Sequence, residues 1–403
     1  MIERDFLVRN APFLAAGVLM TFMSSFGQTF FISVFAGEIR AEFGLTHGEW
    51  GGIYAIGTAL SALVMVWAGG LSDRFRVRAL GPVVLIGLAL ACLAMALNPA
   101  VWALPLVVFA LRFFGQGMSS HIAMVAMTRW FVATRGRALS VATMGFAFGE
   151  AVLPLLFVAL MGLVDWRLLW GIGVLLCLLG APVLGRLLGQ ERTPAALAKS
   201  NSNAGMQGRH WTRRQAITHR LFWMMVPAIL GPSAFITAFF FHQVHFAQVK
   251  GWSHLDLVAF FPIYTVISMA AMILSGWALD RVGSARLTPY YQMPMVLGFL
   301  ICATATEPVA MGAGLFCLAL STGANATLPN AFWAEFYGTA HVGAIKALAA
   351  AVMVLGSAIG PGLTGLLIDG GIGLETQYVG VAGFFVLTTV MMAIAIPSAA
   401  RDL

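Results

Sequence analysis

Charged side chains are scarce in this sequence. Asp, Glu, Lys and Arg together make 10% of its 403 residues, whereas a soluble globular domain carries about 25%. Hydrophobic residues make 60%, and the mean hydropathy is +0.88. So little charge excludes an ordinary soluble protein, and the composition predicts an all-α protein that crosses a lipid bilayer many times.

Cysteine is also scarce, and it occurs without the spacing that holds metals. The four cysteines all lie inside apolar runs, and none belongs to a Cys-x-x-Cys pair. We therefore expect neither disulfides nor a metal site. His242 and His245 are close in sequence, but no third ligand stands near them, and a zinc site needs three or four. The cysteines are Cys92, Cys177, Cys302 and Cys317.

Two families of functional motif are missing. The sequence has no Gly-rich phosphate loop ending in Lys-Ser/Thr and no Gly-x-Ser-x-Gly nucleophile turn, so we expect no ATP drive, no cofactor and no enzyme activity. The net charge of +7 raises the possibility of a nucleic-acid partner. We reject it because the basic residues alternate between loops and form no single patch.

Twelve apolar segments are long enough to cross a bilayer, which takes about 20 residues. The only long polar stretch is 189–219, which is basic and which we interpret as a cytoplasmic linker with a short helix on the membrane surface. It separates an N-terminal six-helix bundle, 1–188, from a C-terminal one, 220–403. The expected spans are 11–36, 49–71, 79–97, 101–127, 137–163, 166–188, 221–247, 257–279, 287–305, 308–332, 342–368 and 377–398.

The distribution of basic residues predicts the orientation. Of the 23 Lys and Arg residues, 19 fall on the side of the two termini and the linker, and three fall on the other side. Basic loops stay in the cytoplasm, so we place both termini there, in a multi-pass protein of the cell's inner (plasma) membrane. The remaining basic residue, Arg112, lies inside a span.

Two motifs occur twice in the chain. A Gly-x-x-x-Asp-Arg motif follows the second span and recurs 207 residues later, which indicates two related halves. A Gly-x-x-x-Gly motif occurs in spans five and eleven, where small residues four apart let helices pack closely. The first pair comprises Gly69, Asp73, Arg74 and Gly276, Asp280, Arg281; the second comprises Gly145, Gly149 and Gly356, Gly360, the latter followed by Pro361.

The repeated Gly-x-x-x-Asp-Arg loop resembles the signature of the major facilitator superfamily, although Arg76 stands where a second glycine is usual. The resemblance implies twelve helices in two pseudo-symmetric six-helix bundles. It also implies a secondary transporter that works by alternating access, with the Asp-Arg pairs acting as a cytoplasmic latch. The run from Trp130 to Gly145 resembles the monocarboxylate porter and oxalate:formate antiporter branch, which implies a small organic anion as cargo, moved with protons or by exchange.

Arg112 in span four and Glu150 in span five are charges in the hydrocarbon core, where each costs roughly 2.5–3.5 kcal/mol. Their predicted depths agree, so one interpretation is an ion pair that neutralises both. The other is that Arg112 binds a substrate carboxylate with its planar fork and Glu150 exchanges a proton. The sequence leaves both open.

Polar residues on spans one, four, seven and ten are the other candidates, because these spans line the central cavity in the family that the sequence resembles. Gln116 and Ser119 are expected to share a helical face with Arg112. For each candidate the alternative is a hydrogen bond between helices. The predicted substrate-binding set is Arg112, Gln116, Gln28, His242 and Asn325.

Two other functions compete with an anion carrier. The many phenylalanines and the Gly145–Gly149 pair fit a proton-coupled exporter of hydrophobic or drug-like compounds, with Glu150 as the proton-responsive acid. A non-transporting membrane receptor would need a soluble output domain, and the linker offers only about thirty residues. In each case we expect a monomer whose partners are a small molecule and the lipid bilayer.

Overall fold

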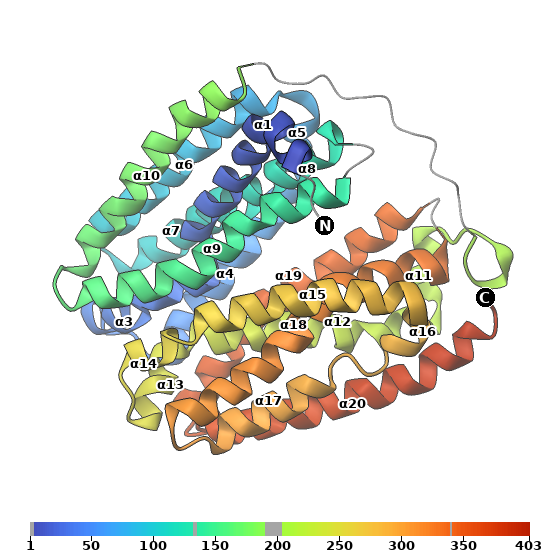
Figure 1. Cartoon of the computed structure of the whole chain (residues 1–403). Helices are drawn as coiled ribbons and strands as arrows, with labels where there is room; N and C mark the ends of the chain where they lie inside the picture. Colours follow the sequence, from blue (N-terminus) through green and yellow to red (C-terminus); the bar gives the residue numbers. More distant parts are fainter. Residues whose placement is uncertain (1–3, 132–134, 190–203, 339–340) are drawn as a thin grey trace. The chain divides into compact units, whose positions relative to one another are not determined.

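A computed structural model describes residues 4–131, 135–189, 204–338 and 341–403 (Figure 1). Within these ranges the chain is helical, and no β-strand occurs. The chain divides into two compact units, Met1–Lys199 with Phe240–Val244, and Ser200–Phe239 with His245–Leu403. The predicted all-helical membrane fold is confirmed.

Within its described residues the first unit has six long, apolar helical stretches, several of them assembled from shorter pieces. In Figure 1, α6 and α10 lie side by side, and α1 packs against α9 and α10. The elements are α1 (Arg4–Met23), η1 (Ser24–Gly27), α2 (Thr29–Ile32), η2 (Ser33–Phe35), α3 (Ala36–Phe43), α4 (His47–Ala68), α5 (Leu71–Arg74), α6 (Val77–Leu97), η3 (Val101–Ala103), α7 (Leu104–Leu111), η4 (Arg112–Ser119), α8 (Ser120–Trp130), α9 (Arg135–Met161) and α10 (Trp166–Leu187).

The second unit repeats this plan with different interruptions. Its helices α15 and α18 pack along each other, and α17 packs against α18 and α20. The elements of this part of the chain are η5 (Met206–Gly208), α11 (Arg213–Thr218), α12 (Arg220–Phe241), α13 (Gln243–Lys250), α14 (His254–Val258), α15 (Phe261–Val282), α16 (Ser284–Leu287), α17 (Met293–Thr304), α18 (Pro308–Tyr337), α19 (Val342–Asp369) and α20 (Leu374–Ala400).

Among the described residues, 11 helices are long and apolar enough to cross a membrane, and a shorter apolar helix, α17, stands where the ninth span is expected. The expected span 287–305 begins instead with a turn, because α16 ends at Leu287 and α17 starts at Met293. Pro294 in the first turn of α17 has no backbone N–H for an upstream carbonyl, so the helix starts there.

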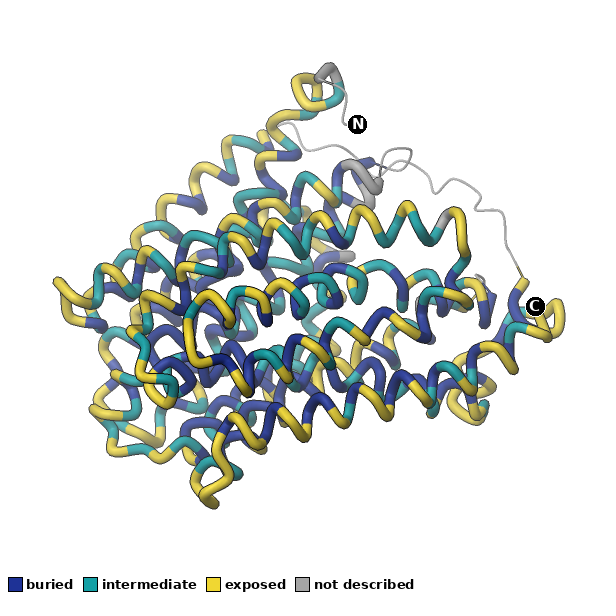
Figure 2. Tube along the Cα trace, turned by 60° about the horizontal axis from the view of Figure 1, so that its bottom comes forward, coloured by how far each residue is buried: buried dark blue, intermediate teal, exposed yellow. Residues whose placement is uncertain are grey.

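Each long helix carries a buried stripe and an exposed stripe (Figure 2). The exposed stripes are apolar: Val66, Leu168 and Leu366, for example, are 74%, 70% and 64% exposed. A water-soluble protein rarely exposes so much contiguous apolar surface, whereas a bilayer solvates it. The outer faces of both units therefore fit contact with lipid chains.

The Gly-x-x-x-Gly motifs bring helices into backbone contact. A Cβ atom at Gly145 of α9 would overlap the Val18 carbonyl of α1, and one at Gly360 of α19 would overlap the Ala234 carbonyl of α12. Hydroxyl groups tie the same helix pairs. Thr21 Oγ1 donates to the Ala142 carbonyl at 2.5 Å, and Ser233 Oγ donates to the Met353 carbonyl at 2.5 Å. Both units thus combine a glycine contact with one hydroxyl bond between the same two helices.

A second kind of contact also occurs in both units. In each, a basic side chain bonds to the carbonyl at a helix end and pairs with an acidic side chain, but the elements that carry the base and the acid are swapped. In the first unit, Arg167 of α10 donates to the Ala96 carbonyl at the end of α6 at 2.9 Å and pairs with Glu42 of α3. In the second, Lys250 of α13 donates to the Ala303 carbonyl at the end of α17 at 2.9 Å and pairs with Glu375 of α20.

Ala96 and Ala303 are separated by the same 207 residues as the Gly-x-x-x-Asp-Arg motifs. In each unit a cation therefore neutralises the negative end of the equivalent helix. The element that carries the cation has changed: it is the sixth span in the first unit and the segment after the seventh span in the second. We call the two arrangements the carbonyl clamps.

The described part of the linker packs on the second unit. The backbone N–H of Trp211 donates to the Tyr337 carbonyl at 2.9 Å, and the rings of these two residues lie 5.7 Å apart. The Gln207 N–H donates to the Asp402 carbonyl at 2.7 Å. The linker contains one short α-helix within its described residues, the six-residue α11, whose Ala216 is buried. Its predicted place on the membrane surface stays a prediction. Residues 190–203 of the predicted linker lie outside the described residues.

The carbonyl clamp of the first unit predicts a pH effect. Hydrogen bonds from Arg167 and Trp166 hold the pKa of Glu42 below its usual value of 4.5, against the opposite effect of burial. A carboxylate with a lowered folded-state pKa stabilises the fold above its unfolded pKa, and the stabilisation is lost as the pH falls through the folded pKa. At neutral pH, Glu42→Gln should lower the stability by about 0.2–1 kcal/mol, because the pair is partly exposed and screened.

The measurement is the midpoint of thermal unfolding of purified protein between pH 3 and pH 7. The gap between Glu42→Gln and the parent should close below pH 4.5. Glu307→Gln, at an exposed acid, is the matched control and should track the parent throughout. A gap that stays constant across this range would contradict an ionic contribution from Glu42.

Candidate functional site

The first spanning helix breaks in its C-terminal half. The α-helix α1 ends at Met23, a 3₁₀ turn follows over Ser24–Gly27, and Gln28 is extended, with φ −86° and ψ 154°. The local sequence favours a break, because serine hydroxyls compete for backbone groups and glycine is a poor helix former. Ser24 Oγ indeed donates to the Thr21 carbonyl at 2.6 Å.

The fourth span widens into a π-helix, η4, over Arg112–Ser119. This turn faces the break in the first span. A Cβ at Gly115 would lie 2.6 Å from Gly27 Cα, and a Cβ at Gly27 would lie 2.7 Å from Gly115 Cα. Only two glycines allow this backbone approach. π-helical turns frequently mark functional sites, and interrupted helices form binding sites in many transporters.

Arg112 joins the two interruptions. Its side chain is 3% exposed, and its Nη1 donates to the Gly27 carbonyl and to Thr29 Oγ1, each at 3.2 Å. The guanidinium carbon lies 5.3 Å from the centroid of the Tyr54 ring. The Tyr54 hydroxyl bonds to Thr29 Oγ1 at 2.5 Å. Arg112 therefore sits in a cradle made by the broken helix and an aromatic face.

One edge of this guanidinium has no partner. Both hydrogen bonds of Arg112 to described residues come from Nη1, and Nε is buried without any partner. Gln116 Oε1 and Ser119 Oγ are buried and unsatisfied as well. Buried polar atoms nearly always have partners. The Nε–Nη2 edge is the fork that binds a carboxylate through two parallel hydrogen bonds.

The structure brings three predicted residues together. Gln28 is 8% exposed and stands between Gly27 and Thr29, the two partners of Arg112. The Gln116 backbone nitrogen would lie 3.0 Å from a Cβ at Gly27. The shared face of Arg112, Gln116 and Ser119 was expected for an α-helix, whereas this turn is a π-helix with i→i+5 hydrogen bonds. The shared face stays a prediction.

His242 lies in the short segment Phe240–Val244, which belongs to the first unit. It is 3% exposed, and its ring lies 6.0 Å from that of His47. The neighbouring Phe241 ring lies 4.6 Å from the Tyr54 ring. The rings of Phe241 and Tyr54 therefore link His242 to Arg112. The expected continuous span 221–247 is interrupted here, since α12 ends at Phe241 and α13 begins at Gln243.

Three residues of the first unit were missed by sequence reasoning. Thr29 and Tyr54 contact Arg112 directly. Gln243 is fully buried, and its Nε2 donates to Ser33 Oγ at 2.7 Å. The sequence after Met23, residues 24–29, is rich in hydroxyl groups and contains a glycine. This pattern could have indicated that Thr29 lies at a break in the helix. Nothing in the sequence singles out Tyr54 or Gln243.

Asn325 belongs to the second unit and takes part in a polar network there. The Tyr291 hydroxyl lies 3.1 Å from Asn325 Oδ1 and 3.2 Å from the Ala228 carbonyl. Gln292 Nε2 donates to that carbonyl at 2.5 Å. Pro232, four residues after Ala228, lacks the N–H that would bond this carbonyl. Asn325 thus has the helix-to-helix hydrogen bond of the alternative reading, and its role in substrate binding stays a prediction.

Glu150 is half-buried in α9 beside Gly149. Pro154 stands four residues later, so the Glu150 carbonyl lacks its usual helical N–H partner. Arg112 forms no ion pair with any described residue, so the expected pair with Glu150 is not seen. The proton-exchange role of Glu150 is not tested by these contacts and stays a prediction. No group of three or more His, Cys, Asp or Glu side chains that could hold a metal occurs within the described residues.

The repeated Gly-x-x-x-Asp-Arg loops are described only in part, because the side chains of Asp73, Arg74 and Asp280 lie outside the described residues. In the first loop, His121 Nε2 lies 3.1 Å from the Gly69 carbonyl and can donate to it. In the second, Arg281 lies 3.9 Å from the Trp277 ring. A Cβ at Gly276 would meet nothing within 4 Å, so close helix packing within its unit does not explain that glycine.

A family model described as the Major Facilitator Superfamily matches residues 17–349. A bacterial homologue of the human lysosomal transporter Spinster has a similar fold. Its inward-facing occupied structure gives a TM-score of 0.70 at 17% identity, covering 97% of this chain and 96% of that one. Its inward-facing unoccupied structure gives 0.67 at 17% identity, covering 98% and 97%.

A mutant of the nucleoside transporter NupG gives a TM-score of 0.72 at 13% identity, covering 95% of this chain and 99% of that one. No curated protein sequence matches the chain. At these identities the structural likeness shows a common fold only.

The contact between Gly27 and Gly115 predicts that Gly115→Ala lowers stability more than Gly117→Ala does. Gly115→Ala places its Cβ against the Gly27 backbone, which cannot move aside, so stability should fall by roughly 1–3 kcal/mol. Gly117→Ala meets the Met65 side chain, 3.0 Å away at its sulfur, which can rotate, and the Arg112 carbonyl at 3.4 Å, which is an ordinary contact distance. Thermal unfolding of the two purified variants checks this. Equal losses in both would contradict the backbone contact.

Proposed function

The chain belongs to the major facilitator superfamily, and we propose that it is a secondary transporter whose cargo is a small organic anion held by Arg112. The family and the fold indicate a transporter rather than an enzyme. The observation that supports an anionic cargo is the buried guanidinium with a free Nε edge. The structural neighbours include a nucleoside transporter, so the fold itself favours no cargo.

A buried cation must be compensated. Arg112 bonds to a carbonyl and a hydroxyl, which are neutral groups, and it forms no ion pair with any described residue. A carboxylate would supply the missing charge and occupy the Nε–Nη2 fork. Gln116 and Gln28, at the same crossing, offer amide donors for the rest of a small acid.

Binding would also affect the broken helix. The guanidinium holds the Gly27 carbonyl and Thr29, so an anion that draws the guanidinium toward itself would weaken both bonds. Those bonds join η4 to the break in the first span. Cargo binding and a change in the packing of the first span are therefore coupled in this proposal.

The proposed transport cycle is alternating access, in which the two halves rock about a central site. In it the Asp73-Arg74 and Asp280-Arg281 pairs latch the cytoplasmic side. The bonds of His121 and Ser72 to the Gly69 carbonyl would hold the first latch against α8. The proposal keeps both termini in the cytoplasm, the inner or plasma membrane as the compartment, and a monomer as the working unit.

Export of hydrophobic compounds is the second candidate. Phenylalanines gather near the break, with the Phe30 and Phe146 rings 5.6 Å apart and the Phe22 and Phe148 rings 5.9 Å apart. Movement of lipophilic cations, together with no movement of acids, would favour this candidate over the anion carrier.

Uptake into proteoliposomes tests the role of Arg112. The parent should take up one or more acids from a labelled panel of lactate, pyruvate, oxalate and benzoate. Arg112→Gln should lower that uptake at least 100-fold, since losing a charged, desolvated partner costs about 3 kcal/mol or more. Arg112→Lys should retain part of it, because lysine keeps the charge and loses the fork. Arg286→Gln, at an exposed arginine, is the control, and acid uptake by Arg112→Gln at the parental rate would refute the proposal.

The proposed proton role of Glu150 is separable from cargo binding. With an imposed pH gradient, the parent should accumulate the acid above equilibrium. Glu150→Gln should abolish this accumulation and keep exchange of internal for external acid, because glutamine can bind but cannot release a proton. Accumulation that persists in Glu150→Gln would exclude this residue as the coupling group.

A further inference from the structure

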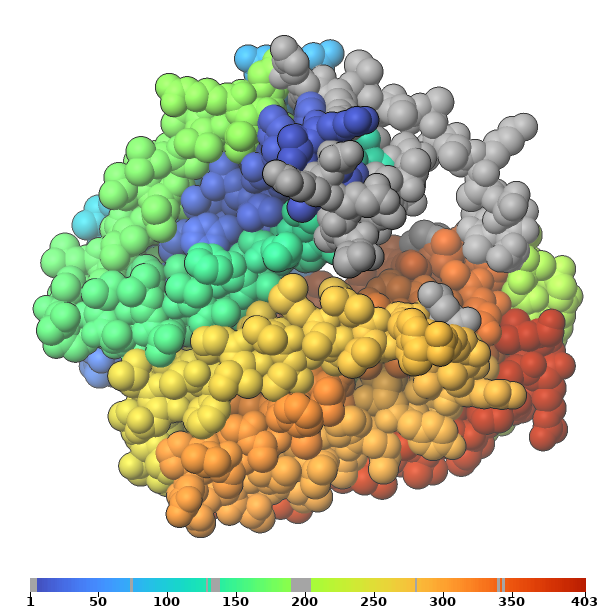
Figure 3. Space-filling model, in the orientation of Figure 1, coloured from blue at the N-terminus to red at the C-terminus, as the bar shows by residue number. Residues whose placement is uncertain are grey.

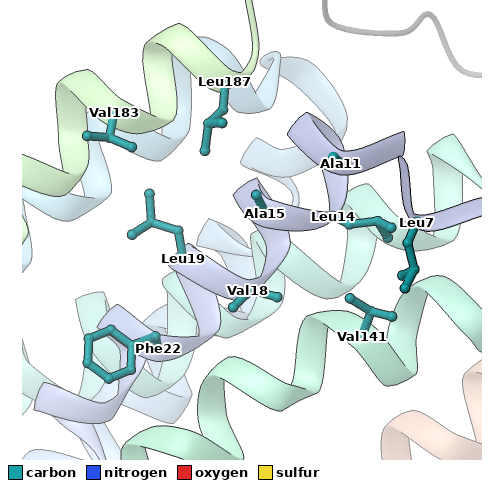
Figure 4. Close-up of a pocket in the computed structure, with 10 residues that line it drawn as sticks. All are labelled: Leu7, Ala11, Leu14, Ala15, Val18, Leu19, Phe22, Val141, Val183 and Leu187. Atoms are coloured by element: carbon teal, nitrogen blue, oxygen red, sulfur yellow. The ribbon is translucent and has the colours of Figure 1, made fainter. Parts of the chain in front are cut away.

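An apolar groove of about 600 Å³ runs along α1 and is walled by α9 and α10 (Figure 4). All ten lining residues are apolar, from Leu7 to Phe22 on α1, with Val141 on α9 and Val183 and Leu187 on α10. Figure 3 shows α1 in dark blue between α9 and α10 on one face of the first unit. We propose that this groove binds one acyl chain of an anionic phospholipid whose phosphate pairs with Arg186.

The shape of the groove follows from the sequence of α1. Ala11 and Ala15 are exposed at its floor, whereas Leu19, Phe22 and Val183 project around it. Small residues one turn apart leave a furrow that larger neighbours deepen. From Leu7 to Phe22 the furrow runs about 22 Å at 1.5 Å per residue, longer than the roughly 15 Å of one lipid leaflet. An extended acyl chain therefore fits along it.

Its position favours lipid over an aqueous ligand. The lining helices lie in three of the candidate membrane spans, and no lining side chain could satisfy a polar group. A groove lined only by apolar side chains favours a neutral, flexible hydrocarbon chain as its ligand.

Basic residues stand at one end of the groove. Arg186 precedes the lining residue Leu187, is exposed, and makes no hydrogen bond or ion pair through its side chain to any described residue. Arg78 Nη1 donates to the Gly189 carbonyl at 3.0 Å, which places a second exposed arginine near the end of α10. Basic clefts between spanning helices bind anionic headgroups, so the charge at this end complements a phosphate that bears a net negative charge.

The test compares two lipids with the same dioleoyl chains, phosphatidylglycerol and phosphatidylcholine, retained by the purified full chain in native mass spectrometry. The parent should retain phosphatidylglycerol at least threefold more than phosphatidylcholine. Arg186→Gln should remove this preference and leave phosphatidylcholine unchanged. Arg286→Gln, at an exposed arginine of the second unit, should behave as the parent.

Filling the groove tests the acyl chain separately. Ala15→Phe occupies the floor and should lower retention of both lipids at least threefold, and its exposed position keeps folding intact. Gly383→Phe, at an exposed site on α20 with nothing within 4 Å, is the control for added bulk. Equal retention of the two lipids by the parent, or parental retention by Ala15→Phe, would overturn the proposal. Neither result depends on which cargo the protein moves.

Discussion

The hydrogen bond from Arg112 to the Gly27 carbonyl is the contact on which the site depends. It joins a π-helical turn in the fourth span to a break in the first, and it is possible only because Gly27 and Gly115 let the two backbones touch. The break frees a carbonyl, the arginine satisfies it, and the π-turn sets where the arginine stands. The unpaired Nε edge is what remains for a ligand.

Some contacts occur at equivalent places in both units, and others differ between the units. Glycine contact and one hydroxyl bond recur between the helix pairs α1–α9 and α12–α19, because close packing needs small residues at the crossing. The carbonyl clamps recur at Ala96 and Ala303, but the cation has changed element. The contacts described for Arg112 lie within the first unit. The negative end of each of the two equivalent helices is neutralised by a cation, but the cation comes from a different element in each unit.

The sequence predicts the gross architecture well, because span length and glycine spacing are local properties. It predicts Arg112 as exceptional, since a buried charge stands out in an apolar run. The break at Gln28 and the shortened ninth helix have local causes, the Ser24–Gly27 run and Pro294, which span length alone does not reveal. The π-turn is not predicted, because it depends on which carbonyl a neighbouring helix satisfies. Ala228 shows this: Pro232 frees its carbonyl, and residues about sixty positions away, Tyr291 and Gln292, bond it. Tyr54 and Gln243 escape prediction for the same reason.

The most direct measurement of the central claim is equilibrium binding of matched acid and amide pairs to the purified protein, such as lactate with lactamide and benzoate with benzamide, by titration calorimetry. An acid and its amide have nearly the same shape and differ in the charge that Arg112 would hold. The account predicts that at least one acid binds the parent, that its amide does not, and that Arg112→Gln binds neither. Equal binding of an acid and its amide, or binding of the acid by Arg112→Gln as tight as by the parent, would contradict it.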